Sequence, residues 1–356
     1  MRISIRFWIF CAVLGFLLRP VRYQYGWIVW FIIGYIITRM VKRTNFFFKQ
    51  VPRSCRYDNG ETVIVTGSSS GIGADVARQL TARGAKVIWA ARSTRVAQEI
   101  LDDIRWSVHH GPRGYVLPID LADLESIRNF VAEFKKREQK LDCLILNAGY
   151  MGPKKTTKDG FEMNLGVNHL GHMYLTYLLM DMLKESVPSR VIVVSSDMHY
   201  FCSGVRFQDL MFEHPGSYTL GGMTAYSHSK LCNVLFVKEL SHRLHGTGVR
   251  VHAAHPGTPI LTGLVRDQGL FMAATVIRAF WSFICHVYCR NSSDGAQNII
   301  YCACSQECGE QSGKYFENTD RYTPSVAARD PIMAGKLWEV SCELLKIDND
   351  WVVPVD

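Results

Sequence analysis

Residues 62–73 read TVIVTGSSSGIG, a short apolar run followed directly by a glycine-rich loop. Glycine is needed in such a loop because the backbone turns tightly and approaches the pyrophosphate of a bound dinucleotide closely. The N-terminus of the helix expected next would face the phosphate charge. The spacing G-x-x-x-G-x-G differs from the commonest dinucleotide fingerprint, but the position between a first strand and a helix strengthens the prediction. The predicted cofactor contacts in the loop are Gly67, Ser69, Ser70, Gly71, Ile72 and Gly73.

The chain from Glu61 onward alternates short apolar runs with amphipathic stretches. The runs predict strands and the stretches between them predict helices. This alternation is typical of parallel βαβ units, so we expect an α/β fold, a Rossmann-type doubly wound parallel sheet with helices on both faces. The predicted strands are Thr62–Val65, Lys86–Ala91, Tyr115–Ile119, Asp142–Leu146, Arg190–Val194 and Val249–Ala254, and the predicted helices include Ala74–Arg83, Ala122–Lys136 and Ala225–Leu244.

The end of the second predicted strand indicates which nicotinamide nucleotide fits. A site for NAD usually places Asp or Glu there to bind the ribose hydroxyls. This chain instead has Ala90-Ala91-Arg92-Ser93. Arg92 can bind a 2′-phosphate through paired charge-assisted hydrogen bonds, although a solvated surface arginine is the alternative. We therefore predict NADP(H) as the cofactor.

Tyr226 and Lys230 are four residues apart in a predicted helix, which places both side chains on one face. A tyrosine hydroxyl has an ordinary pKa of about 10, too high for efficient proton transfer at neutral pH. A nearby ammonium is expected to lower that pKa by stabilising the phenolate. Such a pair is common on helix surfaces, but here it follows the fifth strand of a chain whose first strand ends in a glycine loop. The pair therefore indicates a proton-transfer centre.

The glycine loop, the spacing of Tyr226 and Lys230 and the order of the predicted strands together resemble the short-chain dehydrogenase/reductase family. The resemblance extends from roughly Glu61 to Phe316. The glycine loop and the Tyr226–Lys230 pair stand where that family has its motifs. The resemblance implies a catalytic domain over residues 56–346 and further cofactor contacts. Those contacts are Asp120, Leu121, Asn147, Ala148, Gly149, Tyr226, Lys230, Pro256, Gly257 and Thr258.

The resemblance also implies a catalytic tetrad of Asn168, Ser196, Tyr226 and Lys230. Asn168 would hold a water of the proton relay, Ser196 would hydrogen-bond the substrate oxygen, and Lys230 would also bind the nicotinamide ribose. Hydride moves between the nicotinamide ring and the carbinol carbon, while Tyr226 gives or takes the proton. Ser195 is the alternative to Ser196, but the family's pattern favours the second serine of such a pair.

Three positions depart from the family's pattern. Leu146 stands where an asparagine usually begins the strand-four motif. Thirty positions separate Ser196 from Tyr226, which predicts an inserted loop at the substrate mouth. Thr262 falls one residue late for a contact with the cofactor carboxamide, so the residue that holds this group stays open.

The first fifty residues are much more apolar than the rest of the chain. The runs Phe7–Leu18 and Tyr25–Ile37 are each shorter than the roughly 20 residues that a straight spanning helix needs. Pro20 between them would break one continuous helix. We expect residues 1–50 to form a membrane anchor, either one spanning helix or a re-entrant hairpin. A cleaved signal peptide is the alternative, but no small-residue cleavage site precedes Arg19.

The net charge of +8 includes several basic residues near the N-terminus, flanked by Trp and Tyr. This pattern favours membrane-surface anchoring over nucleic-acid binding. Arg39, Lys42 and Arg43 predict that the domain after the anchor stays in the cytosol. The sequon at Asn291 points instead to the lumen, but sequons often occur by chance.

Eleven cysteines without a framework spacing predict reduced thiols, in keeping with a cytosolic domain. Cys302, Cys304 and Cys308 form a cluster, but no second ligand pair stands at a zinc spacing. We expect no metal site, and interpret these cysteines as buried small hydrophobic residues in a helix.

Within the family, the runs around Asn168, Tyr226 and Pro256 resemble the membrane-bound retinol dehydrogenase branch. The tail at Leu337–Glu343 is similar to the X-linked dehydrogenase/reductase member that handles polyprenols. Both imply a lipophilic substrate. Residues 264–290 are apolar and predict a substrate lid that dips into the bilayer, because Arg278 disfavours a spanning helix. Packing of this segment on the core or on a dimer partner is the alternative.

The sequence thus predicts an NADP(H)-dependent oxidoreductase that interconverts a lipophilic alcohol and its aldehyde or ketone. The resemblance favours the retinol/retinal type, with polyprenols or hydroxysteroids as alternatives. A catalytically silent membrane-bound NADP-binding scaffold is the competing class, but it has no need of Tyr226 and Lys230 together. The resemblance further implies a homodimer at the endoplasmic reticulum membrane or the lipid droplet.

Overall fold

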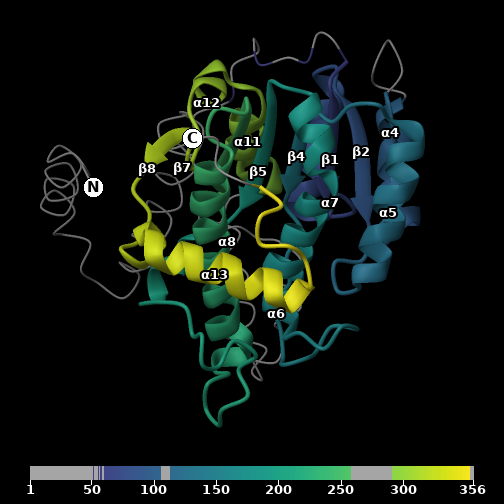
Figure 1. The fold of residues 1–356 in the computed structure, drawn as a ribbon. Helices are drawn as coiled ribbons and strands as arrows, with labels where there is room; N and C mark the ends of the chain where they lie inside the picture. The colour runs from purple at the N-terminus through teal and green to yellow at the C-terminus, as the bar shows by residue number, and fades with distance from the viewer. Residues whose placement is uncertain are drawn as a thin grey trace, which may run out of the picture. The chain divides into compact units, whose positions relative to one another are not determined.

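The computed structural model describes residues 51, 55, 57, 60–105, 113–257 and 291–352. Within them, a single sheet runs in the order β3-β2-β1-β4-β5-β6-β7-β8, with helices in front of and behind it (Figure 1). The strands are β1 (Thr62–Thr66), β2 (Lys86–Ala91), β3 (Gly114–Pro118), β4 (Cys143–Leu146), β5 (Ser189–Val194), β6 (Val249–His255), β7 (Lys314–Glu317) and β8 (Asp320–Tyr322).

The central strands are apolar on both faces because helices cover both sides of the sheet. Every residue of β1 and β4 is buried, as expected for parallel strands in an α/β fold. The sheet is parallel from β3 through β7, which confirms the predicted doubly wound architecture. The strand order reverses between β1 and β4, and ligands of such sheets bind at the carboxyl ends of the strands there.

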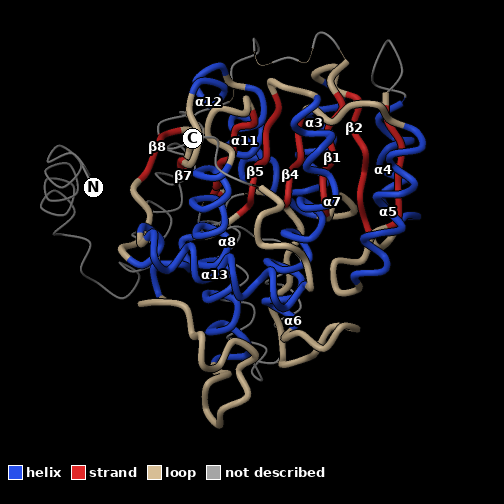
Figure 2. The backbone as a smooth tube through the Cα atoms, in the orientation of Figure 1, coloured by secondary structure: helices blue, strands red, loops and turns tan. Residues whose placement is uncertain are grey.

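Helices pack on the sheet (Figure 2), and two apolar layers hold them there. One layer is built on α5, α7, α8 and α13, and the other on α3, α4 and α11. The helices are α3 (Gly71–Ala82), α4 (Thr94–Arg105), α5 (Leu124–Arg137), α6 (Met163–Leu165), α7 (Gly171–Glu185), α8 (Met223–Arg243), α11 (Ser292–Cys304), α12 (Gln306–Glu310) and α13 (Pro331–Leu345), with a π turn η2 (Gly166–Leu170) and 3₁₀ turns η3 (Asp197–Phe201), η4 (Leu220–Gly222) and η6 (Ala327–Arg329).

Strands β7 and β8 are absent from the sequence prediction, and β8 runs antiparallel to β7. All three residues of β8 are exposed, and β7 begins with Lys314 and ends with Glu317. Neither segment carries the continuous apolar run that marks the six predicted strands. Because of this polar composition, the sequence pattern did not predict the two edge strands β7 and β8.

Three predicted segments lie outside the described residues: the anchor at 1–50, the lid at 264–290, and the cofactor contact Thr258. The described residues belong to one compact unit, Lys49–Asp356. Among them, no helix is both long enough and apolar enough to cross a bilayer.

The cysteines in the described part of the chain are free thiols. Cys302 and Cys304 lie on α11 and Cys308 on α12. Cys302 and Cys308 are fully buried, while the Cys304 thiol donates to the carbonyl of Ile300 at 3.0 Å. No cluster of His, Cys, Asp and Glu suited to a metal ion occurs among the described residues.

Candidate active site

Tyr226 and Lys230 lie in the first two turns of α8, on one face of the helix. The ammonium nitrogen of Lys230 is 5.5 Å from the centre of the Tyr226 ring. Lys230 is 3% exposed, and its Nζ donates to the carbonyl oxygen of Val194 at 3.0 Å. The end of β5 therefore fixes the lysine beneath the tyrosine.

The two serines that follow β5 have different partners. The Ser195 hydroxyl donates to the backbone carbonyl of Lys230 at 3.0 Å, which ties β5 to α8. Ser196 lies close enough to the Tyr226 hydroxyl to lower its pKa. The structure thus brings Ser196, and not Ser195, to the tyrosine.

Asn168 lies in the π turn η2 and is fully buried. Its Oδ1 accepts from the Tyr150 amide at 2.7 Å, and its Nδ2 donates to the Tyr150 carbonyl at 2.9 Å. A Cβ built on Gly149 would lie 3.6 Å from Asn168 Oδ1 and 3.8 Å from Lys230 Nζ. The Asn168 amide and the Lys230 ammonium therefore both lie next to Gly149. Single π turns are often found at functional sites.

The glycine loop forms a cradle from which side chains are excluded. Gly67 has φ +70°, and a Cβ there would come within 2.9 Å of the Ala148 Cα. A Cβ on Gly73 would collide with the Gly67 carbonyl and the Asn147 side chain. Ser70 caps α3 without a side-chain hydrogen bond, so no cap side chain covers the first amides of this helix. These features suit a dinucleotide whose pyrophosphate lies against backbone amides at a helix N-terminus.

The remaining predicted cofactor residues all follow the carboxyl ends of parallel strands. Arg92 is exposed after β2 and forms no ion pair with any described residue. Asp120 follows β3, and its Oδ1 accepts from the Ala122 amide at 3.0 Å. The other members are Leu121 after β3, Asn147 and Ala148 after β4, and Pro256 and Gly257 after β6. Together with the loop they line one edge of the sheet, where the fold predicts ligand binding.

Comparison with known proteins agrees with this geometry. The sequence profile described as short chain dehydrogenase matches residues 61–202. Retinol dehydrogenase 12 of Mus musculus is 42% identical, over 81% of this chain and 87% of that protein. Retinol dehydrogenase 13 of Homo sapiens is 41% identical, over 81% of this chain and 86% of that protein.

The chain belongs to the short-chain dehydrogenase/reductase family. A solved structure of an uncharacterised protein from Mycobacterium paratuberculosis is 31% identical and superposes with a TM-score of 0.65, covering 84% of this chain and 99% of that one. Membership in the family means oxidoreductase chemistry on CH–OH groups with a nicotinamide dinucleotide.

The protonation of this short-chain dehydrogenase/reductase site differs from the sequence expectation. Burial raises the pKa of Tyr226 to about 12, the hydrogen bond with Ser196 acts in the opposite direction, and the Asp197 charge adds to the increase. Burial lowers the pKa of Lys230 to about 8. The prediction that Lys230 lowers the Tyr226 pKa is therefore wrong for this structure, because burial penalises the phenolate and the ammonium points to the Val194 carbonyl. Both shifts favour uncharged groups, which leaves Tyr226 as a proton donor.

Sequence reasoning missed a hydrogen-bonded link between the loop and Asn168. The Thr66 hydroxyl oxygen accepts from the amides of Asn147 at 2.9 Å and Ala148 at 3.0 Å. Its proton points to His172 Nε2 at 3.0 Å, and His172 Nδ1 then donates to the Asn168 carbonyl at 3.1 Å. This assignment follows because the hydroxyl has one proton and two lone pairs. Two features of the sequence could have indicated this link. Thr66 directly precedes Gly67, and His172 follows Asn168 by four residues.

Ser229 was also missed. Its hydroxyl accepts from Asn168 Nδ2 at 2.8 Å and donates to the Tyr226 carbonyl at 2.7 Å. Ser229 therefore joins the π turn η2 to the first turn of α8. Its position next to Lys230 was the signal in the sequence.

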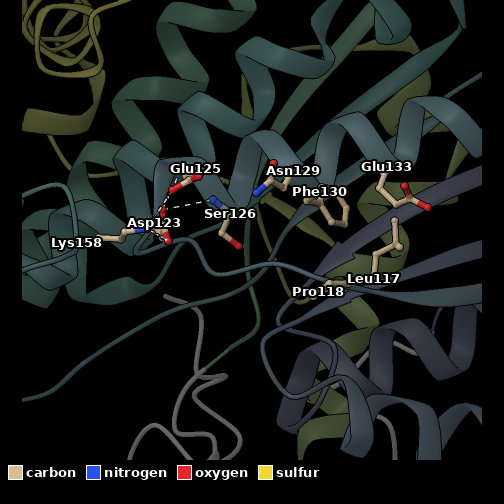
Figure 3. A pocket seen from close by; sticks show the side chains of 9 residues that line it. All are labelled: Leu117, Pro118, Asp123, Glu125, Ser126, Asn129, Phe130, Glu133 and Lys158. Atoms are coloured by element: carbon tan, nitrogen blue, oxygen red, sulfur yellow. Dashed lines mark hydrogen bonds and ion pairs between the residues drawn. The ribbon is translucent and has the colours of Figure 1, made fainter.

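A cavity of about 410 Å³ lies between β3 and α5 (Figure 3) and contains none of the tetrad. Lys158 at its rim pairs with Asp123 at 2.9 Å and Glu125 at 3.2 Å. Glu133, also in the wall, pairs with Arg137 on its own helix. The tetrad lies elsewhere.

Proposed function

We propose that this chain is an NADP(H)-dependent oxidoreductase that interconverts a lipophilic alcohol and its carbonyl, with retinol and retinal as the substrate type. The observation that carries the proposal is Tyr226 next to Ser196, with the buried Lys230 beneath its ring and Asn168 close to Lys230 across Gly149. A scaffold that only binds a nucleotide has no use for this arrangement.

The residues of this chain supply binding and proton transfer. A nicotinamide dinucleotide in the cradle of Gly67–Gly73 supplies hydride chemistry when bound. Tyr226 donates its proton to the carbonyl oxygen in reduction and accepts the alcohol proton in oxidation. Ser196 holds the same oxygen in reach of Tyr226, and the buried Lys230 beneath the tyrosine ring would bind the nicotinamide ribose.

Arg92 supports the choice of NADP(H). It follows β2 at the sheet edge, is exposed, and forms no ion pair within the described part of the chain. Arg92 directly follows β2, where a site for NAD usually has Asp or Glu to bind the ribose hydroxyls. The guanidinium can therefore bind the 2′-phosphate of NADP(H).

The substrate class rests on the relatives and on the sequence of this chain. The relatives at 39–42% identity carry the name retinol dehydrogenase, and residues 1–50 and 264–290 are rich in apolar side chains. We place the enzyme at a membrane, that of the endoplasmic reticulum or the surface of a lipid droplet, with the catalytic domain in the cytosol. An apolar substrate would reach the site from that membrane.

A substrate panel tests the proposal. Full-length protein in detergent is assayed with retinal, a polyprenal and a ketosteroid, each with NADPH and with NADH. We expect retinal reduction with a preference for NADPH. Turnover of only the polyprenal or only the ketosteroid reassigns the substrate class, a preference for NADH rejects the role of Arg92, and bound NADPH without any turnover rejects the enzyme in favour of a scaffold.

A further inference from the structure

His172 lies in the first turn of α7, shortly after the π turn η2 that contains Asn168. Its side chain is buried, as are those of Thr66 and Asn168. The proton transfer described above does not use His172, yet both nitrogens of its imidazole ring have hydrogen-bond partners. The groups that these two bonds join indicate what the ring does.

One side of the His172 ring contacts the start of the nucleotide loop. Nε2 lies 3.0 Å from the hydroxyl oxygen of Thr66, which is the last residue of β1 and directly precedes Gly67. That oxygen accepts from two backbone amides after β4, at 2.9 Å and 3.0 Å, so both of its lone pairs are used. The hydroxyl proton has two acceptors in reach, and His172 Nε2 is nearer than the Ile145 carbonyl oxygen at 3.4 Å.

The other side of the ring contacts the proton-transfer site. Nδ1 lies 3.1 Å from the backbone carbonyl oxygen of Asn168. A carbonyl oxygen only accepts, so Nδ1 carries the ring proton and Nε2 has a free lone pair. From Asn168 the bonds continue to the Ser229 hydroxyl at 2.8 Å and from there to the Tyr226 carbonyl at 2.7 Å. A continuous hydrogen-bonded path therefore joins the end of β1 to the first turn of α8, and His172 is its middle member.

Burial keeps the imidazole in the neutral form that this path needs. It lowers the pKa of His172 to about 3, although the hydrogen bond to the Asn168 carbonyl acts in the opposite direction. A protonated ring would carry hydrogen on both nitrogens, and Nε2 would then face the Thr66 oxygen, whose lone pairs are already used. The neutral ring with its proton on Nδ1 satisfies both neighbours.

We propose that His172 is a positioning residue that holds the nucleotide loop and the proton-transfer site in a fixed relation to each other. Nε2 fixes Thr66 at the start of the loop, and Nδ1 fixes the backbone of Asn168, whose amide lies next to Gly149 as the Lys230 ammonium does. The inference rests on the proposed proton transfer at Tyr226, but not on the identity of the carbonyl.

Two conservative variants separate the two hydrogen bonds. In His172→Gln the side-chain carbonyl reaches the place of Nε2 and can accept from Thr66, but no donor is left for the Asn168 carbonyl. In His172→Asn the shorter amide lies at the place of Nδ1 and can donate to the Asn168 carbonyl, but it does not reach Thr66. His172→Phe keeps a ring at this position and loses both bonds.

The two halves of the proposal have separate readouts in the full-length protein in detergent. The Kd for NADPH is measured by nucleotide fluorescence, and kcat is measured with any carbonyl that is turned over. We expect His172→Asn to raise the Kd about fivefold with kcat within about twofold, because only the bond to the loop is lost. We expect His172→Gln to lower kcat about fivefold with the Kd within about twofold, and His172→Phe to show both effects.

A double-mutant cycle checks that the effect on the loop passes through the Thr66 hydroxyl. Thr66→Val removes this hydroxyl and should itself raise the Kd for NADPH. Adding His172→Asn to Thr66→Val should raise the Kd no further, because the two substitutions remove the same bond. Additive increases would place the effect of His172 elsewhere.

His169→Phe is the matched control. His169 is also buried, lies in the π turn η2, and is hydrogen-bonded to the Ser341 hydroxyl at 2.9 Å, but it is not part of the path. It should lower the melting temperature about as much as His172→Phe does, with the Kd and kcat unchanged. If His172→Phe also lowers only the melting temperature, the role of His172 is structural and the proposal is wrong.

Amide hydrogen exchange over Gly166–Leu170 tests the second half without a substrate. Exchange should be faster than in the wild type in His172→Gln and unchanged in His172→Asn. Together with the Kd for NADPH, this readout decides the inference even if no carbonyl is turned over and the proposed function fails. An unchanged Kd in His172→Asn, or equal exchange in the two amide variants, overturns the proposal. The same two variants decide if His172→Phe does not fold.

Discussion

The glycine loop Gly67–Gly73 and the first turns of α8 lie at the same edge of the sheet, but they are held in place differently. The loop depends on missing side chains, since a Cβ on Gly67 or Gly73 would meet the backbone of the loop or of the β4 end. The α8 face depends on burial, which sets the charge states of Tyr226 and Lys230. A sequence shows the absence of a side chain directly, whereas burial depends on how distant segments pack.

The strongest test of the α8 face is Tyr226→Phe. The ring packing stays, but the proton donor is lost, so kcat should fall about 10³-fold, within the range of general acid–base catalysis. NADPH binding, followed by nucleotide fluorescence, should stay within about twofold because the cradle does not use the hydroxyl proton. A variant that keeps a tenth of the wild-type kcat would remove Tyr226 from proton transfer.

Acid should weaken the helical layer around the tetrad more than the loop, because buried neutral histidines lie in that layer. Burial lowers the pKa of His169 and His172 to about 3 and that of His228 to about 4. Their folded pKa values lie below the unfolded value near 6.5, so the stabilisation they contribute is present above pH 6.5 and is lost as the pH falls toward 3 to 4. At pH 5 each should cost about 2 kcal/mol of unfolding free energy relative to pH 7.

Melting curves between pH 7 and pH 5 measure this loss. The variant His169→Gln should reduce it, whereas His245→Gln should not, because His245 lies exposed in the turn after α8. Equal pH dependence in both variants would exclude the buried histidines as its source.

The loop should respond to an added methyl group through cofactor binding. In Gly67→Ala the φ of +70° and the contact with Ala148 strain the loop, at a cost of about 1–3 kcal/mol. The Kd for NADPH should therefore rise about tenfold or more, while kcat at saturation changes little. Gly335→Ala on α13 is the matched control, because nothing lies within 4 Å of its added Cβ, and it should leave the Kd unchanged. A normal Kd in Gly67→Ala would show that the loop tolerates a side chain.

The sequence was sufficient for the parts of the fold that depend on local patterns. Strands β1 to β6 begin and end within one residue of their predicted limits, because buried parallel strands are continuous apolar runs bounded by polar turns. It was insufficient for β8, whose exposed Asp320–Tyr322 has the composition of a loop. Edge strands lack the buried faces that make strands recognisable.

The candidate site was likewise predicted only in part from the sequence. The motifs placed Gly67, Asn168, Ser196, Tyr226 and Lys230, and the structure brings the last four together. The direction of the Tyr226 pKa was wrong, since Lys230 donates to Val194 at the end of β5. That bond depends on the packing of β5 against α8, which no local motif encodes.

Substitution of Arg92 has the smallest expected effect, and it tests how the cofactor is bound. The backbone of the loop binds a pyrophosphate present in both nucleotides, whereas only NADP(H) has the 2′-phosphate that Arg92 would bind. Loss of a charge-assisted bond of about 1.5 kcal/mol in Arg92→Ala should therefore raise the KM for NADPH about tenfold and leave the KM for NADH unchanged. Arg95→Ala is the matched control, because Arg95 is 88% exposed and pairs with Glu99 on its own helix. If both variants raise the KM for NADPH equally, general positive charge attracts the nucleotide and Arg92 does not select the phosphate.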